Sequence, residues 1–261
     1  MSDETLRFVV LGSGTSSGVP TISCDCPTCR STDPRDKRLR ASLLVQSSTT
    51  NVVIDTTPDF RQQMLSHNIT KLDAVVFTHG HFDHIGGLDD LRAFNYRTHQ
   101  PVKIYANIPT LERIKRTFFY IFEEPEQIGG GIPQLDINLI DNEPFQIGDI
   151  VFEPLKLFHG KMLVIGFRIG SLAYCTDTNF IPEETLQKLV GLDVLILDAL
   201  RYDKHSTHFN LEEAISVAKV VKARQTYFTH IAHQIRHSEC ESTLPESISL
   251  AYDGLEILAN K

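Results

Sequence analysis

Short apolar segments separated by polar or glycine-containing turns occur along the whole chain, and this pattern favours β-strands. The segments lie at residues 6–11, 41–46, 51–54, 74–77, 102–105, 150–158, 164–169, 172–175, 193–197 and 226–228, with a further strand near Ile137. Stretches between them predict helices at about 58–67, 88–96, 109–122, 182–189 and 211–221. Strands in both halves of the chain, with helices after them, predict two sheets packed face to face and covered outside by helices.

No Pro/Ser-rich linker, charge block or low-complexity tract divides the 261 residues, so we expect residues 1–261 to form a single domain. An apolar fraction of 41% and a charged fraction of 22% are typical of a soluble globular protein. No apolar run is long enough to span a bilayer, and the first residues lack the basic and apolar regions of a secretion signal. We therefore expect a cytoplasmic protein without a membrane partner.

The formal net charge is -8, which argues against an extended binding surface for nucleic acid. A local basic cleft could still hold one phosphate. We accordingly expect a small anionic substrate rather than a nucleic-acid partner.

The most informative motif follows the apolar run at 73–78 and contains His79, His81, Asp83 and His84 within six residues. Imidazole and carboxylate groups at this spacing are typical metal ligands. The alternative is a polar turn with surface histidines. The density of donors favours a metal site.

Three further candidate ligands follow later apolar segments, namely His159, Asp177 and His230. A residue at the end of a strand lies at the rim of the core, where a metal can bind and water can enter. Each of the three, taken alone, could equally be a cap or a hydrogen-bonded rim residue. The segments 75–79 and 226–230 both end in Phe-Thr-His, which suggests that two halves of the chain face one site.

A second cluster contains Cys24, Cys26 and Cys29, whose spacing favours a zinc knuckle over disulfides in a reducing compartment. A structural zinc needs a fourth donor. Both His237 and Cys240 are available for that role. The alternative is an empty, reduced knuckle.

Taken together, the His79 cluster followed in order by His159, Asp177 and His230 resembles the metallo-β-lactamase fold superfamily across essentially the whole chain. Within it, the segment 11–20, the cysteine knuckle and the segment 229–233 resemble the cyclic phosphodiesterases of the carbon-phosphorus lyase pathway. Those enzymes act on phosphoribosyl 1,2-cyclic phosphate. The resemblance implies an α/β fold, a four-layer αββα sandwich.

The resemblance also implies a dinuclear site with two divalent ions, zinc or manganese. One ion would be held by His79, His81 and His159, the second by Asp83, His84 and His230, and Asp177 would bridge the two. Asp55 would orient a ligating histidine; its alternative role is a turn cap. His233 would be the fourth ligand of one structural zinc, in competition with His237 and Cys240.

The chemistry of such a pair agrees with phosphoester hydrolysis, because two ions can share a water, lower its pKa and yield a metal-bridging hydroxide. We expect Asp83 and His208 to be the catalytic residues. His208, which resemblance favours over His205, would protonate the leaving group. Either histidine could instead merely cap the helix that begins at Leu211.

The sequence thus predicts a dinuclear metal-dependent phosphodiesterase acting on a small cyclic or nucleotide-like phosphodiester. Two alternatives use the same fold. One is an endoribonuclease of the tRNA 3'-processing kind, which usually carries a long flexible arm that this sequence lacks. The other is a thioester or lactone hydrolase. The resemblance further suggests a homodimer.

Overall fold

A computed structural model of the chain describes residues 4–124 and 131–261. The strands are β1 (Thr5–Gly12), β2 (Ser42–Gln46), β3 (Asn51–Ile54), β4 (Ala74–Val76), β5 (Val102–Ala106), β6 (Leu135–Leu139), β7 (Phe145–Ile147), β8 (Ile150–His159), β9 (Met162–Ile169), β10 (Leu172–Cys175), β11 (Val194–Asp198), β12 (Gln225–Thr229), β13 (Ile248–Leu250) and β14 (Glu256–Asn260). The helices are α1 (Pro27–Arg30), α2 (Phe60–Ser66), α3 (Phe82–Ile85), α4 (Arg92–Thr98), α5 (Ile108–Thr117), α6 (Phe119–Phe122), α7 (Glu183–Lys188), α8 (Leu211–Val221) and α9 (His237–Glu241), with 3₁₀ turns η1 (Pro34–Asp36) and η2 (Leu88–Leu91).

Within the described residues the strands form two seven-stranded sheets, in the orders β14-β1-β2-β3-β4-β5-β6 and β13-β12-β11-β10-β9-β8-β7. Each sheet is mixed. In the first, β3 to β6 are parallel, and in the second, β10 to β13 are parallel. The carboxyl ends of these parallel strands carry the loops in which most of the predicted site residues occur.

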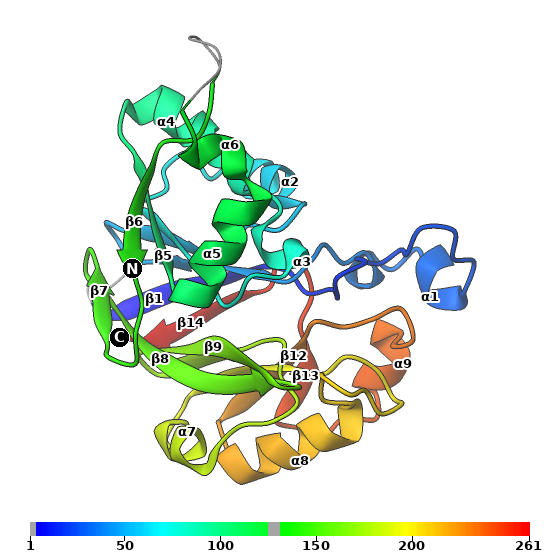
Figure 1. Ribbon diagram of the computed structural model, residues 1–261. Coiled ribbons are helices and arrows are strands. Elements are labelled where there is room, and N and C mark those ends of the chain that lie inside the picture. Colours follow the sequence, from blue (N-terminus) through cyan, green and yellow to red (C-terminus); the bar gives the residue numbers. More distant parts are fainter. Residues whose placement is uncertain (1–3, 125–130) are drawn as a thin grey trace.

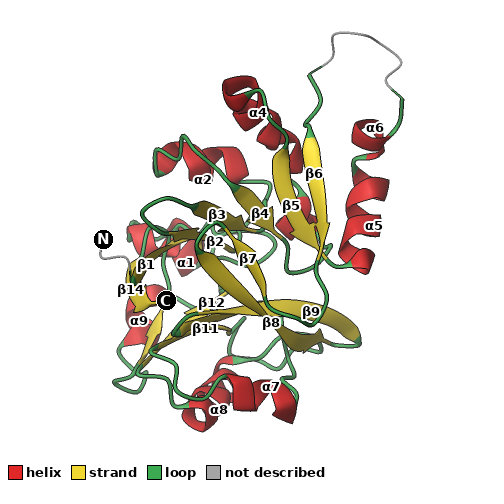
Figure 2. Ribbon diagram, turned by 90° about the vertical axis from the view of Figure 1, so that its left-hand side faces the viewer, coloured by secondary structure: helices red, strands yellow, loops and turns green. Residues whose placement is uncertain are grey.

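The two sheets pack face to face, and helices cover both outer faces (Figures 1 and 2). Helices α2, α4, α5 and α6 lie on the first sheet, and α7 and α8 lie on the second. Between the sheets, Phe8 and Ile54 of one sheet belong to the same apolar cluster as Phe152, Phe167 and Ile196 of the other. This arrangement confirms the predicted four-layer αββα sandwich.

Burial on both faces explains why many strands appear in the sequence as continuous apolar runs rather than alternating ones. In β1, Phe8 and Val10 contact the other sheet, whereas Val9 and Leu11 belong to the cluster under the outer helices. A second outer cluster joins Leu197 and Phe228 to the helices on the opposite side.

The predicted helix at 109–122 is two helices, α5 and α6. Phe118 separates them, because its backbone leaves the helical conformation (φ -113°, ψ 43°) while its ring is buried in the cluster beneath α5. Likewise the predicted helix at 88–96 begins as the 3₁₀ turn η2 before α4. Three strands were not predicted from the sequence: β7 and β13 have three residues each, and β14 pairs with the distant strand β1.

Among the residues that the structure describes, no helix is both long enough and apolar enough to cross a membrane.

Candidate metal centre

Residues that follow strands of both sheets meet at one edge of the sandwich. His79 lies three residues after β4 of the first sheet, and β8 of the second sheet ends at His159. Asp177 follows β10, and His230 follows β12. The Asp177 Oδ1 atom is 3.9 Å from His79 Nε2 and 3.3 Å from His230 Nε2, so the two Phe-Thr-His segments face one carboxylate.

The short helix α3 places the rest of the histidine motif around the same carboxylate. His81 precedes its first residue, and Asp83 and His84 lie within its single turn. His84 Nε2 is 3.1 Å from Asp177 Oδ2 and 3.3 Å from Asp83 Oδ2. Ligand atoms of Asp83, His84, Asp177 and His230 all lie within 4.8 Å of one another.

On the other side of Asp177 the remaining predicted ligands approach one another. His79 Nε2 is 3.0 Å from His81 Nδ1, and the ring centroids of His81 and His159 are 5.2 Å apart. His159 Nδ1 lies 2.7 Å from the carbonyl oxygen of Thr207, which leaves Nε2 available. Atoms of His159, Asp177 and His208 also lie within 4.8 Å of one another. The structure therefore brings all seven predicted dinuclear ligands, and His208, to one place.

Three residues at this edge have a left-handed backbone although none is glycine: Asp55 (φ 66°), Asp177 (φ 51°) and His230 (φ 60°). Such conformations cost on the order of 1–3 kcal/mol each and persist where the surroundings over-determine them. Each lies within two residues of the end of a strand. The left-handed backbone turns the side chain of each residue toward the site close to the end of its strand.

Asp55 is fully buried and contacts the loop that carries the histidine motif. It accepts hydrogen bonds from the Thr78 N–H (2.8 Å) and the Thr78 hydroxyl (2.7 Å). Its Oδ2 is also 2.8 Å from His84 Nδ1, so the N–H at that position donates to Asp55 and Nε2 faces Asp177. Burial raises the pKa of Asp55 above its ordinary value, and the contact with His84 opposes this effect.

The carboxylates of the cluster favour positive charge on two of its histidines, whereas burial lowers the pKa of the other three histidine ligands. Burial opposes charge on His84, yet the carboxylates of Asp177, Asp83 and Asp55 outweigh it and raise the pKa of His84 well above its usual value. In the same way the carboxylates raise the pKa of His230 to about 9 against the effect of burial. A site that stabilises protons on buried imidazoles also stabilises a cation placed among them.

The available lone pairs fit metal binding. His84 Nε2 and His230 Nε2 are buried and make no hydrogen bond, although carboxylate oxygens lie nearby. Buried polar atoms without partners are rare and call for an explanation. Imidazole nitrogens and carboxylates converging in this way are the donor set of zinc, manganese and related divalent ions.

The cysteine knuckle forms a separate cluster. His233 Nδ1 is 3.1 Å from Cys24 Sγ, 3.5 Å from Cys26 Sγ and 3.7 Å from Cys29 Sγ. His237 and Cys240 lie elsewhere: the first donates its N–H to Asp36, and the second is buried in the apolar cluster under α8. The structure therefore places His233, and neither competitor, at the three thiols.

Local backbone donors suit thiolates at this knuckle. The Cys29 N–H lies 3.4 Å from Cys26 Sγ, and the Thr21 N–H donates to Cys29 Sγ at 3.3 Å. Burial raises the pKa of Cys26, but the Cys29 N–H and then His233 lower it to about 6, whereas burial raises the pKa of Cys29 to about 11. Thiolates close to an imidazole are the donor set of a structural zinc.

Asp198, the last residue of β11, was not predicted from the sequence as a site residue. Its Oδ2 is 2.7 Å from His208 Nδ1 and accepts the Thr178 N–H at 2.8 Å. The same criterion that selected Asp177, a carboxylate at the end of an apolar strand, would have found it. His205 is less buried than His208 and its Nδ1 lies near the Thr207 hydroxyl (3.2 Å).

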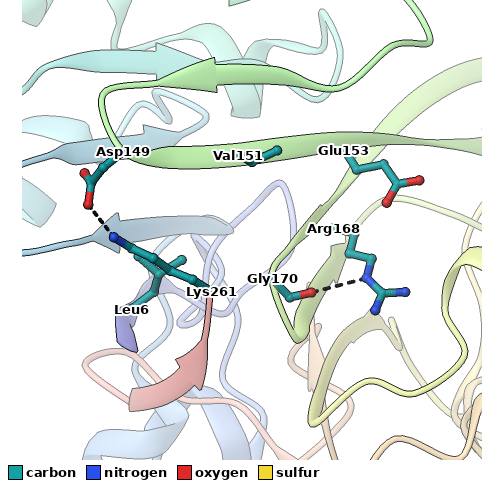
Figure 3. Close-up of a pocket in the computed structure, with 7 residues that line it drawn as sticks. All are labelled: Leu6, Asp149, Val151, Glu153, Arg168, Gly170 and Lys261. Atoms are coloured by element: carbon teal, nitrogen blue, oxygen red, sulfur yellow. Dashed lines mark hydrogen bonds and ion pairs between the residues drawn. The ribbon is translucent and has the colours of Figure 1, made fainter. Parts of the chain in front are cut away.

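A cavity of about 360 Å³ lies away from the histidines, beside the turn between β7 and β8 (Figure 3). Its charged groups are already paired: Lys261 with Asp149, and Arg168 with the carbonyl oxygen of Gly170 (3.2 Å). None of the candidate metal ligands lines it. The metal centre is therefore the better candidate for a reactive site.

The chain is similar to a known protein superfamily and to several solved structures. A sequence model described as the beta-lactamase superfamily domain matches residues 50–231. The crystal structure of a new diphosphatase from the PhnP family is 45% identical, with a TM-score of 0.92, and the match covers 98% of each chain. The zinc-bound PqqB structure from Methylobacterium extorquens, at 19% identity and a TM-score of 0.75, covers 96% of this chain and 99% of PqqB and shows the fold alone.

A curated relative, the octanoyltransferase of Porphyromonas gingivalis, is 38% identical over 259 residues. The match covers 98% of this chain but 52% of that protein, so the chain spans about half the relative's length.

We expect His233→Ala to lower the zinc content of the purified protein by about one ion per chain, because a tetrahedral structural site needs all four donors. Elemental analysis by mass spectrometry measures this directly. His237→Ala is the matched control and should retain the ion. Loss of zinc in the control, with retention in His233→Ala, would refute the assignment.

Proposed function

Because the chain belongs to the beta-lactamase superfamily and is a metal-dependent hydrolase of that fold, we propose that it hydrolyses small phosphodiesters at the candidate metal centre. The observation that carries this proposal is the Asp177 carboxylate, which imidazoles from both sheets approach: His79 and His230 lie beside Oδ1, and His84 lies beside Oδ2. A carboxylate with two oxygens so placed can serve two cations at once.

In the proposed site, His79, His81 and His159 would hold one divalent ion, Asp83, His84 and His230 would hold the other, and Asp177 would serve both. When bound, two such ions lower the pKa of a shared water and offset the charge that develops on a phosphoryl group. The chain's own contribution is to fix the ligands: Asp55 orients His84, and the Thr207 carbonyl orients His159.

His208 is the proposed proton donor to the leaving group. Its Nδ1–H donates to Asp198, so Nε2 is the atom that faces the site. The ring stacks on His230 at 4.7 Å between centroids and lies 4.4 Å from the ring of His159. Asp198 fixes this orientation, and an imidazole held with Nε2 toward the site is suitably placed to deliver a proton to a departing alkoxide.

His205 is the weaker candidate for this role. Its ring centroid is 5.1 Å from that of His208, and it has no carboxylate partner comparable to Asp198 among the described residues. A more exposed imidazole without such a partner is held less firmly.

The substrate class that we propose follows from the relatives. The structure at 45% identity is named a diphosphatase, so we include diphosphate linkages with the phosphodiesters. A cyclic phosphodiester on a ribose remains the specific substrate that we propose to examine first.

We expect the zinc- or manganese-loaded protein to hydrolyse bis(p-nitrophenyl) phosphate, and a chelator to abolish the activity, because no side chain here replaces the ions. Release of p-nitrophenolate, followed by absorbance, measures it. A thioester substrate is the control for acyl chemistry. Thioester turnover without phosphodiester turnover would contradict the proposal and assign the protein to the acyl hydrolases.

We expect His208→Gln to lower kcat by roughly 100-fold or more for a phosphodiester with an alkyl leaving group. The loss should be much smaller for a p-nitrophenyl ester, because p-nitrophenolate departs without a proton. The measurement is kcat for the two esters in parallel, with His205→Gln as the matched control. Equal losses for both esters would show that His208 acts in some other way, for example as a ligand.

A further inference from the structure

A cavity of about 310 Å³ is lined by helices α2 and α4, which lie on the outer face of the first sheet (Figure 1). The ring of Phe60 in α2 meets the ring of Phe94 in α4 at 6.3 Å between centroids, and both residues line the cavity. Its volume lies at the lower end of the range found for small-molecule sites. None of the candidate metal ligands lines it, so it is a second site, separate from the metal centre.

The lining of this cavity is mainly apolar. Its apolar members come from both helices and from the loop after α2, and they are Phe60, Met64, Leu65, Ile69, Ala93 and Phe94. Phe60, Met64 and Phe94 are buried in the cluster beneath the helices, whereas Leu65 is 57% exposed. Covering such a surface with an apolar ligand removes it from water and is favourable. The lining therefore suits a ligand with an apolar body.

Two arginines also line the cavity, Arg61 from α2 and Arg97 from α4. Arg61 lies four residues before Leu65, and Arg97 lies four residues after Ala93. Residues at this spacing are neighbours on one face of a helix, so each arginine is on the cavity side of its own helix. Neither guanidinium forms an ion pair with any residue that the structure describes. On a chain with a net charge of -8, this positive charge at an apolar cavity favours an anionic ligand.

The acidic member of the lining is Asp90, and it limits the charge that a ligand can carry. Burial and then Asp89 raise the pKa of Asp90, while Arg92 and Arg61 oppose that rise, so the charges of Arg61 and Asp90 offset one another. Arg97 is seven residues further along the chain, roughly 10 Å away at the helical rise per residue. Two guanidiniums against one carboxylate leave one positive charge for the ligand, at the Arg97 end.

We propose that this cavity binds a small amphipathic monoanion, whose head group pairs with Arg97 and whose apolar chain covers Met64 and Leu65. A guanidinium can bind a carboxylate through two parallel hydrogen bonds, which fixes the head group. The apolar chain then lies along the cavity toward Phe60 and Phe94. This binding site goes beyond the proposed hydrolase function and does not depend on it.

The methionines allow a selective test, because the chain contains three of them: Met1, Met64 and Met162. Met64 lines the cavity, whereas Met162 begins β9, three residues after the candidate metal ligand His159. In zinc-loaded protein carrying ¹³C-labelled methionine methyl groups, heptanoate should shift the Met64 signal in a saturable way and leave that of Met162 unchanged. Pentanoate should bind roughly tenfold more weakly than heptanoate, since it buries two fewer methylene groups.

Variants and a neutral analogue test the two halves of the ligand separately. Arg97→Gln should weaken heptanoate binding roughly tenfold, because a hydrogen bond between charged groups is lost. Leu65→Gln, at an exposed position, should also weaken it through the loss of apolar contact. Arg116→Gln is the matched control, since it removes the same charge from α5, outside the cavity, and should leave the affinity unchanged. Heptan-1-ol should bind the wild type more weakly than heptanoate.

Four results would overturn the proposal. The first is no shift of the Met64 signal with heptanoate up to about 10 mM, a concentration that detects even weak binding. The second is a shift confined to Met162, which would show binding at the metal centre instead. The third is equal binding of heptan-1-ol and heptanoate, and the fourth is an equal loss of affinity in Arg116→Gln and Arg97→Gln, since neither agrees with a head group held by Arg97.

Discussion

The carboxylate of Asp177 imposes the main constraint on this molecule. It is almost completely buried between imidazoles that come from different sheets, and Asp55 and Asp83 add two more carboxylates nearby. Removing ionised carboxylates from water costs several kcal/mol each unless opposite charge is close. His84 and His230 have raised pKa values for that reason, and divalent cations meet the same requirement while adding chemistry. The convergence of two sheets at one edge is what makes so dense a cluster attainable.

One segment connects this centre to the cysteine knuckle, because His230 and His233 are three residues apart. A buried ion pair supports that segment from the other side: Arg38 and Asp36 have fully buried side chains 3.0 Å apart. Arg38 donates to the carbonyl oxygen of Ala232 at 3.3 Å, and Asp36 accepts the N–H of His237 at 2.8 Å. The knuckle and the ion pair therefore fix the backbone on which His230 depends, which gives the cysteines a structural role in positioning a ligand.

Sequence reasoning located this centre because its residues obey a local rule: imidazole or carboxylate groups placed just after apolar strands. That rule selected His159, Asp177 and His230, and it would also have selected Asp198 had β11 been followed to its last residue. The choice of His233 over His237 and Cys240 could not be derived from spacing, because all three lie within one short segment and only the turn after β12 decides which faces the thiols. The packing of α5 on the metal loop could not be predicted, because the contact between Arg113 and Gly80 joins elements that are separate in the sequence.

Anomalous diffraction at the zinc edge, from crystals of the zinc-loaded protein, tests the dinuclear assignment most directly. The account predicts two peaks roughly 3.5–4 Å apart that share Asp177, and a third peak among Cys24, Cys26, Cys29 and His233. A single peak among the histidines, with Asp177 bound to one ion or to none, would contradict it.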